Sequence, residues 1–503
     1  MVKIYKKSLG EIASLFDSEV ISSDKKAHES FIYKIEYDSR KAGSGDIFVC
    51  LLGARSDGHK FASMAYESGC RAFLCEYIPH DLPKDAAIII VNDTRAALAK
   101  LSAYFYDYPA DKLKLIGITG TKGKTTTALL ISSILNKNGK NCAYIGSNGV
   151  IINGERTETV NTTPESKELH HYFALMVENG VKYAAIEVSS QALAHHRVDG
   201  IDFAVKAFTN LSPDHITDCE HKDFDDYKNA KASFFNGYSG DIIYNMDDPE
   251  SLSVISGHSD TAELVSVGMN PDANFFGSGG TPYRDSMTLG IEFICSFCGK
   301  ETAVKLRSPG GFSIYNGLTA IACANRMGVS VEYSAAALAD TSVMGRFEIV
   351  PGLPGRTFII DYAHNGESMR RALASLREYE PSRLIVVFGS VGGRTTGRRK
   401  EMGEAASMLA DLSVITSDNP DYEDQMQIID EIASHMDPSH PYVKIADREK
   451  AVRHAIRISE DGDIVFFAGK GHETYQLIFG KKVPFIEADI IRDECLIILS
   501  EAN

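Results

Sequence analysis

A short glycine-rich segment, residues 117–127, carries the residue types that bind phosphate groups. Its glycines leave backbone N–H groups open to an anion, and Lys124 adds a positive charge for the β- and γ-phosphates. Thr125 supplies the hydroxyl that a Mg²⁺ ion coordinates in such turns, although Ile118 stands where the full pattern has its first glycine. The segment predicts a nucleoside triphosphate site formed by Gly120, Thr121, Lys122, Gly123, Lys124, Thr125 and Thr126.

Three polar residues further along the chain could serve the same nucleotide. Glu187 ends an apolar segment, where a carboxylate can hold Mg²⁺ directly or through water; the alternative is an acid that faces solvent. His215 follows Asp214 at another strand-to-loop position, and a single histidine of this kind is more often a hydrogen-bonded structural residue than a ligand. Lys231 lies on a predicted helix, and the pattern alone predicts a surface lysine there.

The elements that must position these residues alternate between strands and helices. Residues 114–119 are typical of a buried strand, and residues 126–138 have the composition of a helix. Further strands are predicted at residues 46–52, 72–75, 87–91, 183–188, 203–209, 357–362, 384–388, 412–416 and 464–467. Such alternation predicts an α/β fold with mostly parallel sheets, whose ligands bind at the carboxyl ends of the strands.

The chain divides into three predicted domains, at residues 1–110, 111–342 and 343–503, with residues 108–111 as the first linker. The glycine-rich residues 277–281 are expected to form a hairpin loop. Residues 469–473, Gly-Lys-Gly-His-Glu, follow the last predicted strand, and their two glycines allow a ligand to approach the backbone.

Composition favours an ordinary enzyme over several other classes. The 503 residues carry a net charge of −16, which argues against nucleic acid as a partner. We find no signal-peptide pattern and no long apolar run, so we do not expect membrane insertion or secretion. We expect a cytoplasmic location. The nine cysteines are scattered, and the single pair Cys295 and Cys298 has no zinc-type partner, so reduced thiols near a hairpin are favoured.

Taken together, the motifs resemble those of the Mur ligase family, in the branch that adds the third amino acid of the peptidoglycan stem peptide. The resemblance covers nearly the whole chain and rests on segments in the family's order: residues 120–126, 161–164, 187–190, 210–231, 345–348, 361–364, 418–420 and 469–476. Residues 38–40, 45–48 and 57–59 are similar to this branch's N-terminal UDP-binding domain. The family implies an α/β fold of three domains: a UDP-binding domain, a central P-loop ATPase domain and a C-terminal Rossmann-like domain that binds the incoming amino acid.

The resemblance implies a reaction in which ATP phosphorylates the substrate's terminal carboxylate and an amine then attacks the acyl phosphate. The γ-phosphoryl group and the carboxylate are both anions that must come together. Lys124, Arg346 and two Mg²⁺ ions would supply the positive charge that this requires. One metal would be held by Thr125 and Glu187, and the other by His215 with Lys231, whose amine is carbamylated in the family.

The resemblance also assigns contacts with UDP-MurNAc-L-Ala-D-Glu and with ATP. The muramyl dipeptide would be held by Thr162, Thr163, Ser189 and Arg197, and the UDP end by Ser39 and Arg40. The adenine nucleotide would contact Asn316, Arg346 and Asp361. A monomer is expected.

The incoming amino acid depends on residue 421. In members that add meso-diaminopimelate, Asp-Asn-Pro is followed by an arginine that pairs with the distal carboxylate, whereas this chain has Asp421. A carboxylate there favours a side-chain ammonium, so lysine is expected first and ornithine second, bound between Asp418, Asn419, Asp421, Gly469 and Glu473. The alternative is that Asp421 caps a turn while Arg394 or Arg398 binds a diaminopimelate carboxylate.

Two other functions remain open at this point. The chain could be a related ATP-dependent amide ligase with another acceptor, such as a folylpolyglutamate-type enzyme or a divergent paralogue, although the UDP-type N-terminal domain argues against it. It could also be a nucleotide-binding switch without ligase activity, although such a switch does not need the Gly-Lys-Gly-His-Glu segment.

Overall fold

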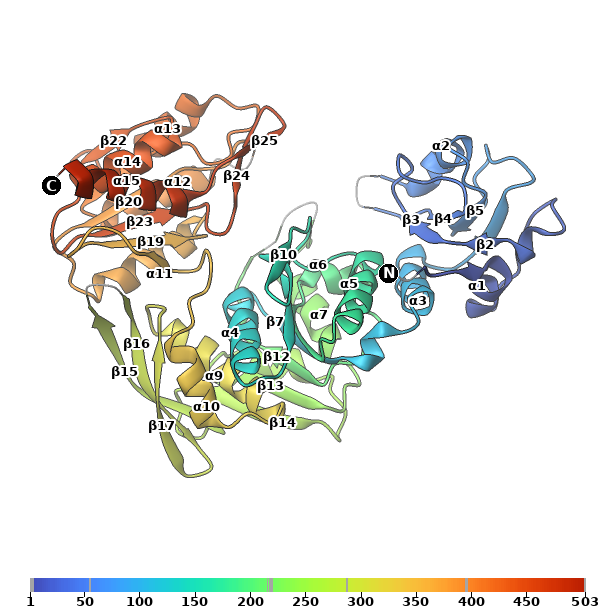
Figure 1. Cartoon of the computed structure of the whole chain (residues 1–503), viewed down its shortest axis with the longest axis horizontal. Coiled ribbons are helices and arrows are strands. Elements are labelled where there is room, and N and C mark those ends of the chain that lie inside the picture. The colour runs from blue at the N-terminus through green and yellow to red at the C-terminus, as the bar shows by residue number, and fades with distance from the viewer. Residues whose placement is uncertain are drawn as a thin grey trace. The chain divides into compact units, whose positions relative to one another are not determined.

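The computed structural model of the chain describes residues 4–53, 56–214, 216, 220–285, 288–393 and 397–501. The chain forms two compact units, Met1–Ser266 and Val267–Asn503 (Figure 1). His215 and Arg394 lie outside the described residues.

The first unit begins with a four-stranded parallel sheet in the order β3-β4-β5-β6. Its elements are β1 (Lys7–Ser8), α1 (Leu9–Leu15), β2 (Phe31–Ile32), β3 (Lys34–Glu36), β4 (Asp46–Val49), α2 (Ala62–Glu67), β5 (Ala72–Cys75), β6 (Ala87–Ile90) and α3 (Thr94–Phe105). Alternate strand residues enter opposite layers: Ile47 and Leu74 pack with α1 and α3, whereas Phe48 and Phe73 pack with α2. The sheet is therefore covered on both faces.

The second sheet of this unit carries the phosphate-binding segment on its central strand β7 (Figure 1, cyan to green). The elements are β7 (Lys114–Thr119), α4 (Lys124–Lys137), β8 (Cys142–Gly146), β9 (Gly149–Ile152), β10 (Glu155–Thr157), α5 (Ser166–Glu178), β11 (Tyr183–Glu187), α6 (Ser190–Ala194), β12 (Val205–Phe208), α7 (Phe224–Ala232), β13 (Asp241–Asn245) and α8 (Ser251–Ile255). Strands β8, β11, β7, β12 and β13 lie side by side and parallel. Their carboxyl ends therefore meet at one edge, where α/β sheets bind ligands.

The second unit starts with an antiparallel meander and two helices, entered through β14 (Glu263–Gly268). These elements are β15 (Phe275–Arg284), β16 (Leu289–Phe297), β17 (Lys300–Leu306), α9 (Phe312–Arg326) and α10 (Val331–Ala339). The hairpin loop predicted at residues 277–281 is wrong, because these residues lie inside β15, where a bulge between Ser278 and Thr281 absorbs the glycines. Cys298 does lie at a hairpin turn, with a φ of 50°.

A six-stranded sheet in the order β18-β19-β23-β20-β21-β22 ends the chain, with only β18 antiparallel to its neighbour. Its elements are β18 (Glu348–Val350), β19 (Thr357–Asp361), α11 (Gly366–Arg377), β20 (Leu384–Phe388), α12 (Gly397–Leu409), β21 (Leu412–Ile415), α13 (Gln425–Ser434), β22 (Tyr442–Lys444), α14 (Arg448–Ile458), β23 (Ile464–Ala468), β24 (Tyr475–Ile478), β25 (Lys481–Pro484) and α15 (Glu487–Glu501). One face packs against α11, α12 and α13, and the other against α14 and α15. The predicted α/β fold is confirmed, while domain boundaries near residues 110 and 342 stay a prediction.

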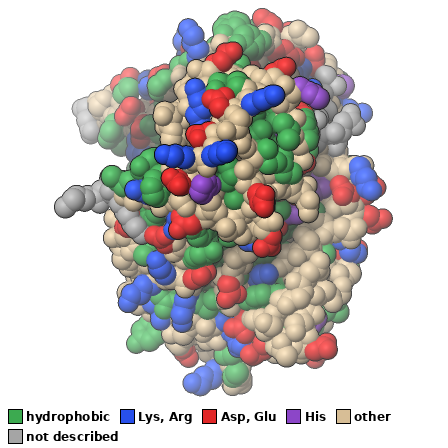
Figure 2. Space-filling model, turned by 90° about the vertical axis from the view of Figure 1, so that its right-hand side faces the viewer, with side chains coloured by type: hydrophobic (Ala, Val, Ile, Leu, Met, Phe, Trp, Pro, Cys, Tyr) green, Lys and Arg blue, Asp and Glu red, His purple; other side chains and the backbone are tan. Residues whose placement is uncertain are grey.

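On the face seen in Figure 2, acidic and basic side chains are interspersed. Among the described residues, no helix combines the length and the apolar character needed to cross a membrane.

A buried ion pair joins the two helices that share a face of the C-terminal sheet. Arg448 of α14 donates from Nε to Glu487 Oε1 of α15 at 2.8 Å, and both side chains are fully buried. The same guanidinium donates to the carbonyl oxygens of Ser417 and Ala468. These two residues immediately precede the loops that start at Asp418 and Gly469, so Arg448 anchors both loops from behind.

Replacing Arg448 by methionine should lower the free energy of unfolding by about 3–5 kcal/mol, because Glu487 would be left buried without its cation. Chemical denaturation of the two proteins measures this difference. The matched control is Arg371→Ala, which removes an exposed pair with Glu367 on α11 and should cost about 0.5 kcal/mol or less. Equal losses in the two variants would contradict the role of burial.

Candidate nucleotide and substrate site

The phosphate-binding turn is held in shape by its neighbouring strand. Gly120 has a φ of 143°, and a Cβ atom there would lie 2.0 Å from Thr209 Oγ1, at the end of β12. Thr209 Oγ1 donates to the Lys122 carbonyl at 2.7 Å, and the Lys122 N–H donates to Asn210 Oδ1 at 2.9 Å. Only glycine fits at residue 120, and the turn leads directly into α4, whose first residue is Lys124.

Lys124 lies over this turn. Its Nζ donates to the carbonyl oxygens of Gly120 and Thr121, at 2.8 and 2.9 Å. Its neighbour Lys122 pairs with Asp214 at 2.9 Å. Both lysines thus lie at the turn, and the role of Lys124 in phosphate binding stays a prediction.

A hydroxyl and a carboxylate suited to Mg²⁺ meet beside the turn. Thr125 Oγ1 donates to Glu187 Oε2 at 2.9 Å, and Glu187 is fully buried at the end of β11. The other carboxylate oxygen accepts from the Ser147 N–H at 2.9 Å and from the Tyr144 hydroxyl. Glu187 is thus not a solvent-facing acid, and Thr125 with Glu187 offers the oxygen ligands that Mg²⁺ prefers.

Lys231 is buried, so the expectation of a surface lysine is wrong. Its side chain is 1% exposed on α7, and Nζ donates to the Gly120 carbonyl at 2.8 Å and lies over the Tyr227 ring. Burial, followed by the charge of Lys124, lowers the pKa of Lys231 well below its ordinary value. The amine can therefore be neutral, which is the form that reacts with carbon dioxide. Its predicted partner His215 lies outside the described residues.

The residues predicted to hold the muramyl dipeptide lie together at the same sheet edge. Thr163 Oγ1 donates to the Glu187 carbonyl at 2.7 Å and accepts from the Ser189 N–H at 3.1 Å. Arg197 donates to the Thr163 carbonyl, and Thr162 shares a hydrogen bond with Ser147, the residue that binds Glu187. Glu187 thus connects this group to the phosphate-binding turn.

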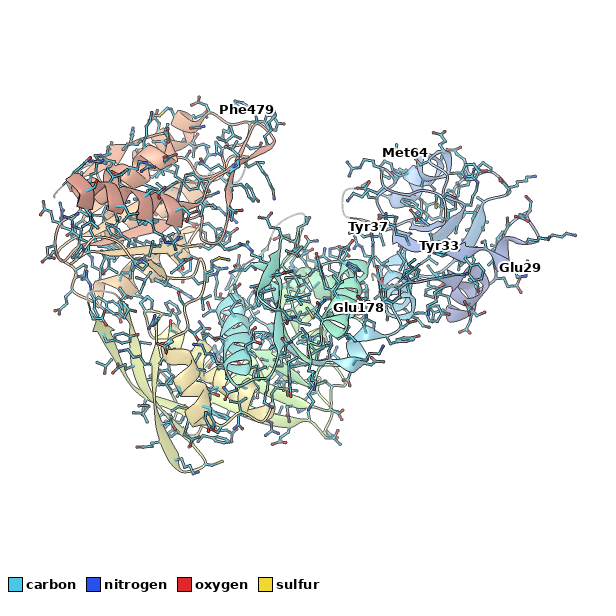
Figure 3. The ribbon with its side chains drawn as sticks, in the orientation of Figure 1. Glu29, Tyr33, Tyr37, Met64, Glu178 and Phe479 are labelled. Atoms are coloured by element: carbon cyan, nitrogen blue, oxygen red, sulfur yellow. The ribbon has the colours of Figure 1, made fainter. Side chains whose placement is uncertain are left out.

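Ser39 and Arg40 form a separate group after β3. Ser39 Oγ donates to Met64 Sδ at 3.3 Å, and Met64 lies on α2 (Figure 3). Arg40 forms a two-point pair with Asp38, at 2.8 and 2.9 Å. These contacts stay within the N-terminal sheet and its loops, so a role at the UDP end stays a prediction.

In the second unit, two of the predicted adenine-nucleotide residues are neighbours. Burial raises the pKa of Asp361, while the Arg346 charge and the Phe347 N–H, 2.9 Å away, oppose that rise. The Arg346 guanidinium also lies 5.0 Å from the centre of the Tyr362 ring. Asn316 is buried within α9.

Three of the residues predicted to bind the incoming amino acid surround a lysine that the sequence analysis had not assigned. Lys470 is fully buried, and its Nζ donates to Glu473 Oε2 at 2.6 Å and to Asn419 Oδ1 at 2.8 Å. Asp418 Oδ1 lies 3.4 Å from the same nitrogen. Gly469 has a φ of 105°, which lets the backbone pass against Asp418. The position of Lys470 between two glycines was the sequence signal that could have identified it.

Asp421 has the turn-capping contacts that were stated as the alternative. Its φ is 53°, its Oδ1 accepts from the Gly480 N–H at 2.7 Å, and its carbonyl accepts from the Phe479 N–H. Asp421 therefore closes the β24–β25 hairpin onto the loop after Asn419. Arg394, one of the two arginines considered for a distal carboxylate, lies outside the described residues.

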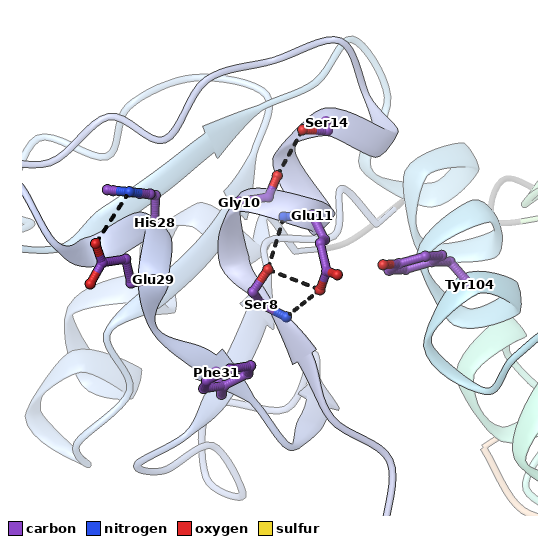
Figure 4. A pocket seen from close by; sticks show the side chains of 8 residues that line it. All are labelled: Ser8, Gly10, Glu11, Ser14, His28, Glu29, Phe31 and Tyr104. Atoms are coloured by element: carbon purple, nitrogen blue, oxygen red, sulfur yellow. Dashed lines mark hydrogen bonds and ion pairs between the residues drawn. The ribbon is translucent and has the colours of Figure 1, made fainter.

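Two further features of the first unit lie apart from these groups. Cys50, His59 and Cys75 converge, but His59 Nδ1 already bonds Asp57 and Nε2 accepts from the Glu76 N–H, so the cluster is held as a structural one. A cavity of about 810 Å³ is lined by residues that include Ser8, Glu11, His28, Glu29, Phe31 and Tyr104 (Figure 4). It contains none of the predicted site residues.

Three family models match the chain in order. They describe the Mur ligase family catalytic domain at residues 31–106, the Mur ligase middle domain at residues 118–324 and the Mur ligase glutamate ligase domain at residues 345–471.

The chain is similar to curated MurE-type relatives along most of its length. It is 37% identical to the UDP-N-acetylmuramoyl-L-alanyl-D-glutamate–2,6-diaminopimelate ligase of Caldanaerobacter subterraneus, over 91% of this chain and 93% of the relative. The ligase of the same name from Geobacillus kaustophilus is 38% identical, over 92% and 94%. A solved structure of a ligase of this name has a TM-score of 0.69 at 26% identity, over 98% of this chain and 99% of that chain.

The family models run through both compact units and include the phosphate-binding turn, Glu187 and, in the C-terminal cluster, Asp418, Asn419 and Lys470. The protein therefore belongs to the Mur ligase family and is an ATP-dependent ligase that forms a carbon–nitrogen bond.

Proposed function

We propose that this ligase uses ATP and Mg²⁺ to add the third amino acid to UDP-MurNAc-L-Ala-D-Glu in peptidoglycan precursor synthesis. The observation that carries the proposal is the position of Glu187. Its carboxylate accepts from Thr125 beside the phosphate turn, while its carbonyl accepts from Thr163 in the group expected to bind the dipeptide. The transferred phosphoryl group and the receiving carboxylate would therefore meet at one strand end. The names of the curated relatives support the same acceptor.

The chemistry requires an activated carboxylate. Transfer of the γ-phosphoryl group to the terminal carboxylate of the dipeptide forms an acyl phosphate and releases ADP. The incoming amine then attacks the acyl carbon, phosphate leaves, and the amine loses a proton as the amide forms. Lys124 would offset the repulsion between the phosphoryl oxygens and the carboxylate.

Thr125 and Glu187 would hold one Mg²⁺ ion, which would add positive charge beside the transferred group. Lys231 would serve a second ion after its neutral amine combines with carbon dioxide, giving a carbamate and one released proton. Its burial and its hydrogen bond to a backbone carbonyl support this role, because a carbamate would turn a buried cation into an anionic ligand.

L-Lysine is the acceptor that the charges around the C-terminal cluster favour. Asp418, Glu473 and Asp421 bring three carboxylates to adjoining loops, and Lys470 is already bonded to Glu473 and Asn419. Arg399 is likewise paired, with Glu423 and Glu431. The side-chain ammonium of lysine is better matched to these carboxylates than the distal carboxylate of meso-diaminopimelate. meso-Diaminopimelate is the second candidate, favoured by the relatives' names and by the turn-capping contact of Asp421.

Phosphate release with UDP-MurNAc-L-Ala-D-Glu and a panel of amino acids tests the proposal, with mass spectrometry of the product. We expect lysine to have a specificity constant at least about tenfold above that of meso-diaminopimelate, as one charged contact provides. Asp421→Arg should reverse the preference, whereas Glu404→Arg, the same charge change on the exposed side of α12, should leave it unchanged. A higher constant for meso-diaminopimelate would refute the charge argument, and no amino-acid-dependent release would refute the function.

Lys231→Ala should lose nearly all turnover, and added short carboxylic acids should restore part of it by replacing the carbamate oxygens. In the wild-type protein, ¹³C-labelled bicarbonate should give a carbamate NMR signal that the variant lacks. Lys228→Ala is the matched control, since Lys228 lies on the same helix and pairs with Glu250. Full activity of Lys231→Ala would sink the carbamate hypothesis.

Lys470→Met should raise the KM for the incoming amino acid by about tenfold or more, because Asn419 and Glu473 lose the cation that orients them. The KM values for ATP and for the UDP substrate should change less than about twofold on the same reasoning. Lys444→Met, which removes a partly exposed pair with Asp430, is the control. Parallel rises in all three KM values would show a general structural role instead.

A further inference from the structure

Two arginines from different parts of the first unit converge on one glutamate. Arg95 lies on α3, beside the N-terminal sheet, and Arg197 follows α6 in the P-loop sheet. Arg197 Nη2 lies 2.7 Å from Glu165 Oε1, and Arg95 Nη1 lies 3.9 Å from Glu165 Oε2. All three side chains are largely buried, with exposed fractions of 11–18%.

Each guanidinium keeps a buried donor without a hydrogen-bond partner among the described residues: Nη1 of Arg95 and Nε of Arg197. Other donors of the same groups are anchored, because Arg95 Nε donates to the Leu52 carbonyl at 2.8 Å and Arg197 Nη1 to the Thr163 carbonyl at 3.1 Å. The guanidinium groups are therefore held in place with donors to spare. A buried N–H group without an acceptor is costly, so such donors point to a missing acceptor.

The charges around Arg95 and Arg197 also point to a missing anion. Glu165 is the one largely buried carboxylate that the described contacts give to both arginines, while Asp93 is half-exposed and caps α3. Burial, followed by Arg95 and Arg197, lowers the pKa of His195 to about 4, so this ring is neutral near pH 7. His196 bonds Asp199. Two buried cations thus share one buried anion.

We propose that Arg95 and Arg197 together bind an anionic group of the UDP-linked substrate, a carboxylate or a phosphate, across the junction of the two sheets. The inference rests on the proposed function and adds Arg95 to the residues that the family resemblance had assigned. Each guanidinium would donate one charge-assisted hydrogen bond to such oxygens from its remaining N–H group. Arg197 reaches Thr163, so the anion would lie beside the group expected to hold the dipeptide. One anion would thereby connect the N-terminal sheet to the catalytic edge.

Isothermal titration of the full-length protein with UDP-MurNAc-L-Ala-D-Glu, without ATP, tests this site. Arg95→Met should weaken binding about 10- to 100-fold, the effect of one charge-assisted contact. Arg95→Lys keeps the charge, loses the guanidinium, and should weaken binding by a smaller factor. Arg71→Met is the control, since this arginine of the same domain contacts only the Tyr66 ring and nearby carbonyls in the described structure. Thermal melting checks that each variant is folded.

The ligand series separates the two sources of the anion. If the arginines bind the diphosphate, UDP alone should bind Arg95→Met more weakly than the wild-type protein, by the same factor as the full substrate. If a glutamyl carboxylate is bound, UDP should bind both proteins equally, and an analogue with the D-glutamyl α-carboxylate amidated should bind both equally too. Unchanged affinity of the full substrate for folded Arg95→Met and Arg95→Lys would overturn the proposal while leaving the function intact. Wild-type protein that binds none of these nucleotides would overturn both.

Discussion

Two side-chain amines meet at one backbone oxygen, the carbonyl of Gly120, and the nucleotide half of the site depends on this contact. Lys124 and Lys231 each donate to it at 2.8 Å. Burial, followed by the charge of Lys124, lowers the pKa of Lys231. Because residue 120 has no room for a Cβ atom beside Thr209, the carbonyl cannot move far. The strand and the turn thus hold two lysine side chains against one fixed oxygen.

Much of the framework could be predicted from sequence because strands of this fold are short apolar runs that end in glycine or polar residues. The strands at residues 72–75, 114–119 and 384–388 have the predicted bounds, and most others differ by one or two residues. The prediction of a hairpin loop at residues 277–281 was wrong because glycines are also tolerated inside a bulged strand. The expectation that Lys231 lies on the surface was wrong for another reason. Helix α7 is rich in charged residues, and its helical pattern does not reveal that one lysine faces a backbone carbonyl of a distant turn.

The chemical groups were more predictable than their contacts. Thr125, Glu187, Thr163 and Ser189 were assigned from motifs, and the structure brings them together at one sheet edge. Arg95 was not assigned, because nothing in its immediate sequence distinguishes it from an ordinary surface cation. Lys470 was not assigned either, although it lies between two glycines. Their importance comes from residues that are distant along the chain, Asn419 for Lys470 and Glu165 for Arg95. Asp421 shows the reverse case, since its position suggested ligand binding while its side chain also closes a turn.

Arg448 binds the carbonyl groups just before both loops of the amino-acid cluster, so these loops share one rigid support. A substitution that shifts either loop start must disturb the other, and this couples Asp418 to Glu473 through the backbone. The part of the cluster that can vary without such a penalty lies further out, near residue 421 and the hairpin that follows β24. Under the proposed function, the outer part would select the side chain of the acceptor, while the two anchored loops would hold its α-amino end in one place.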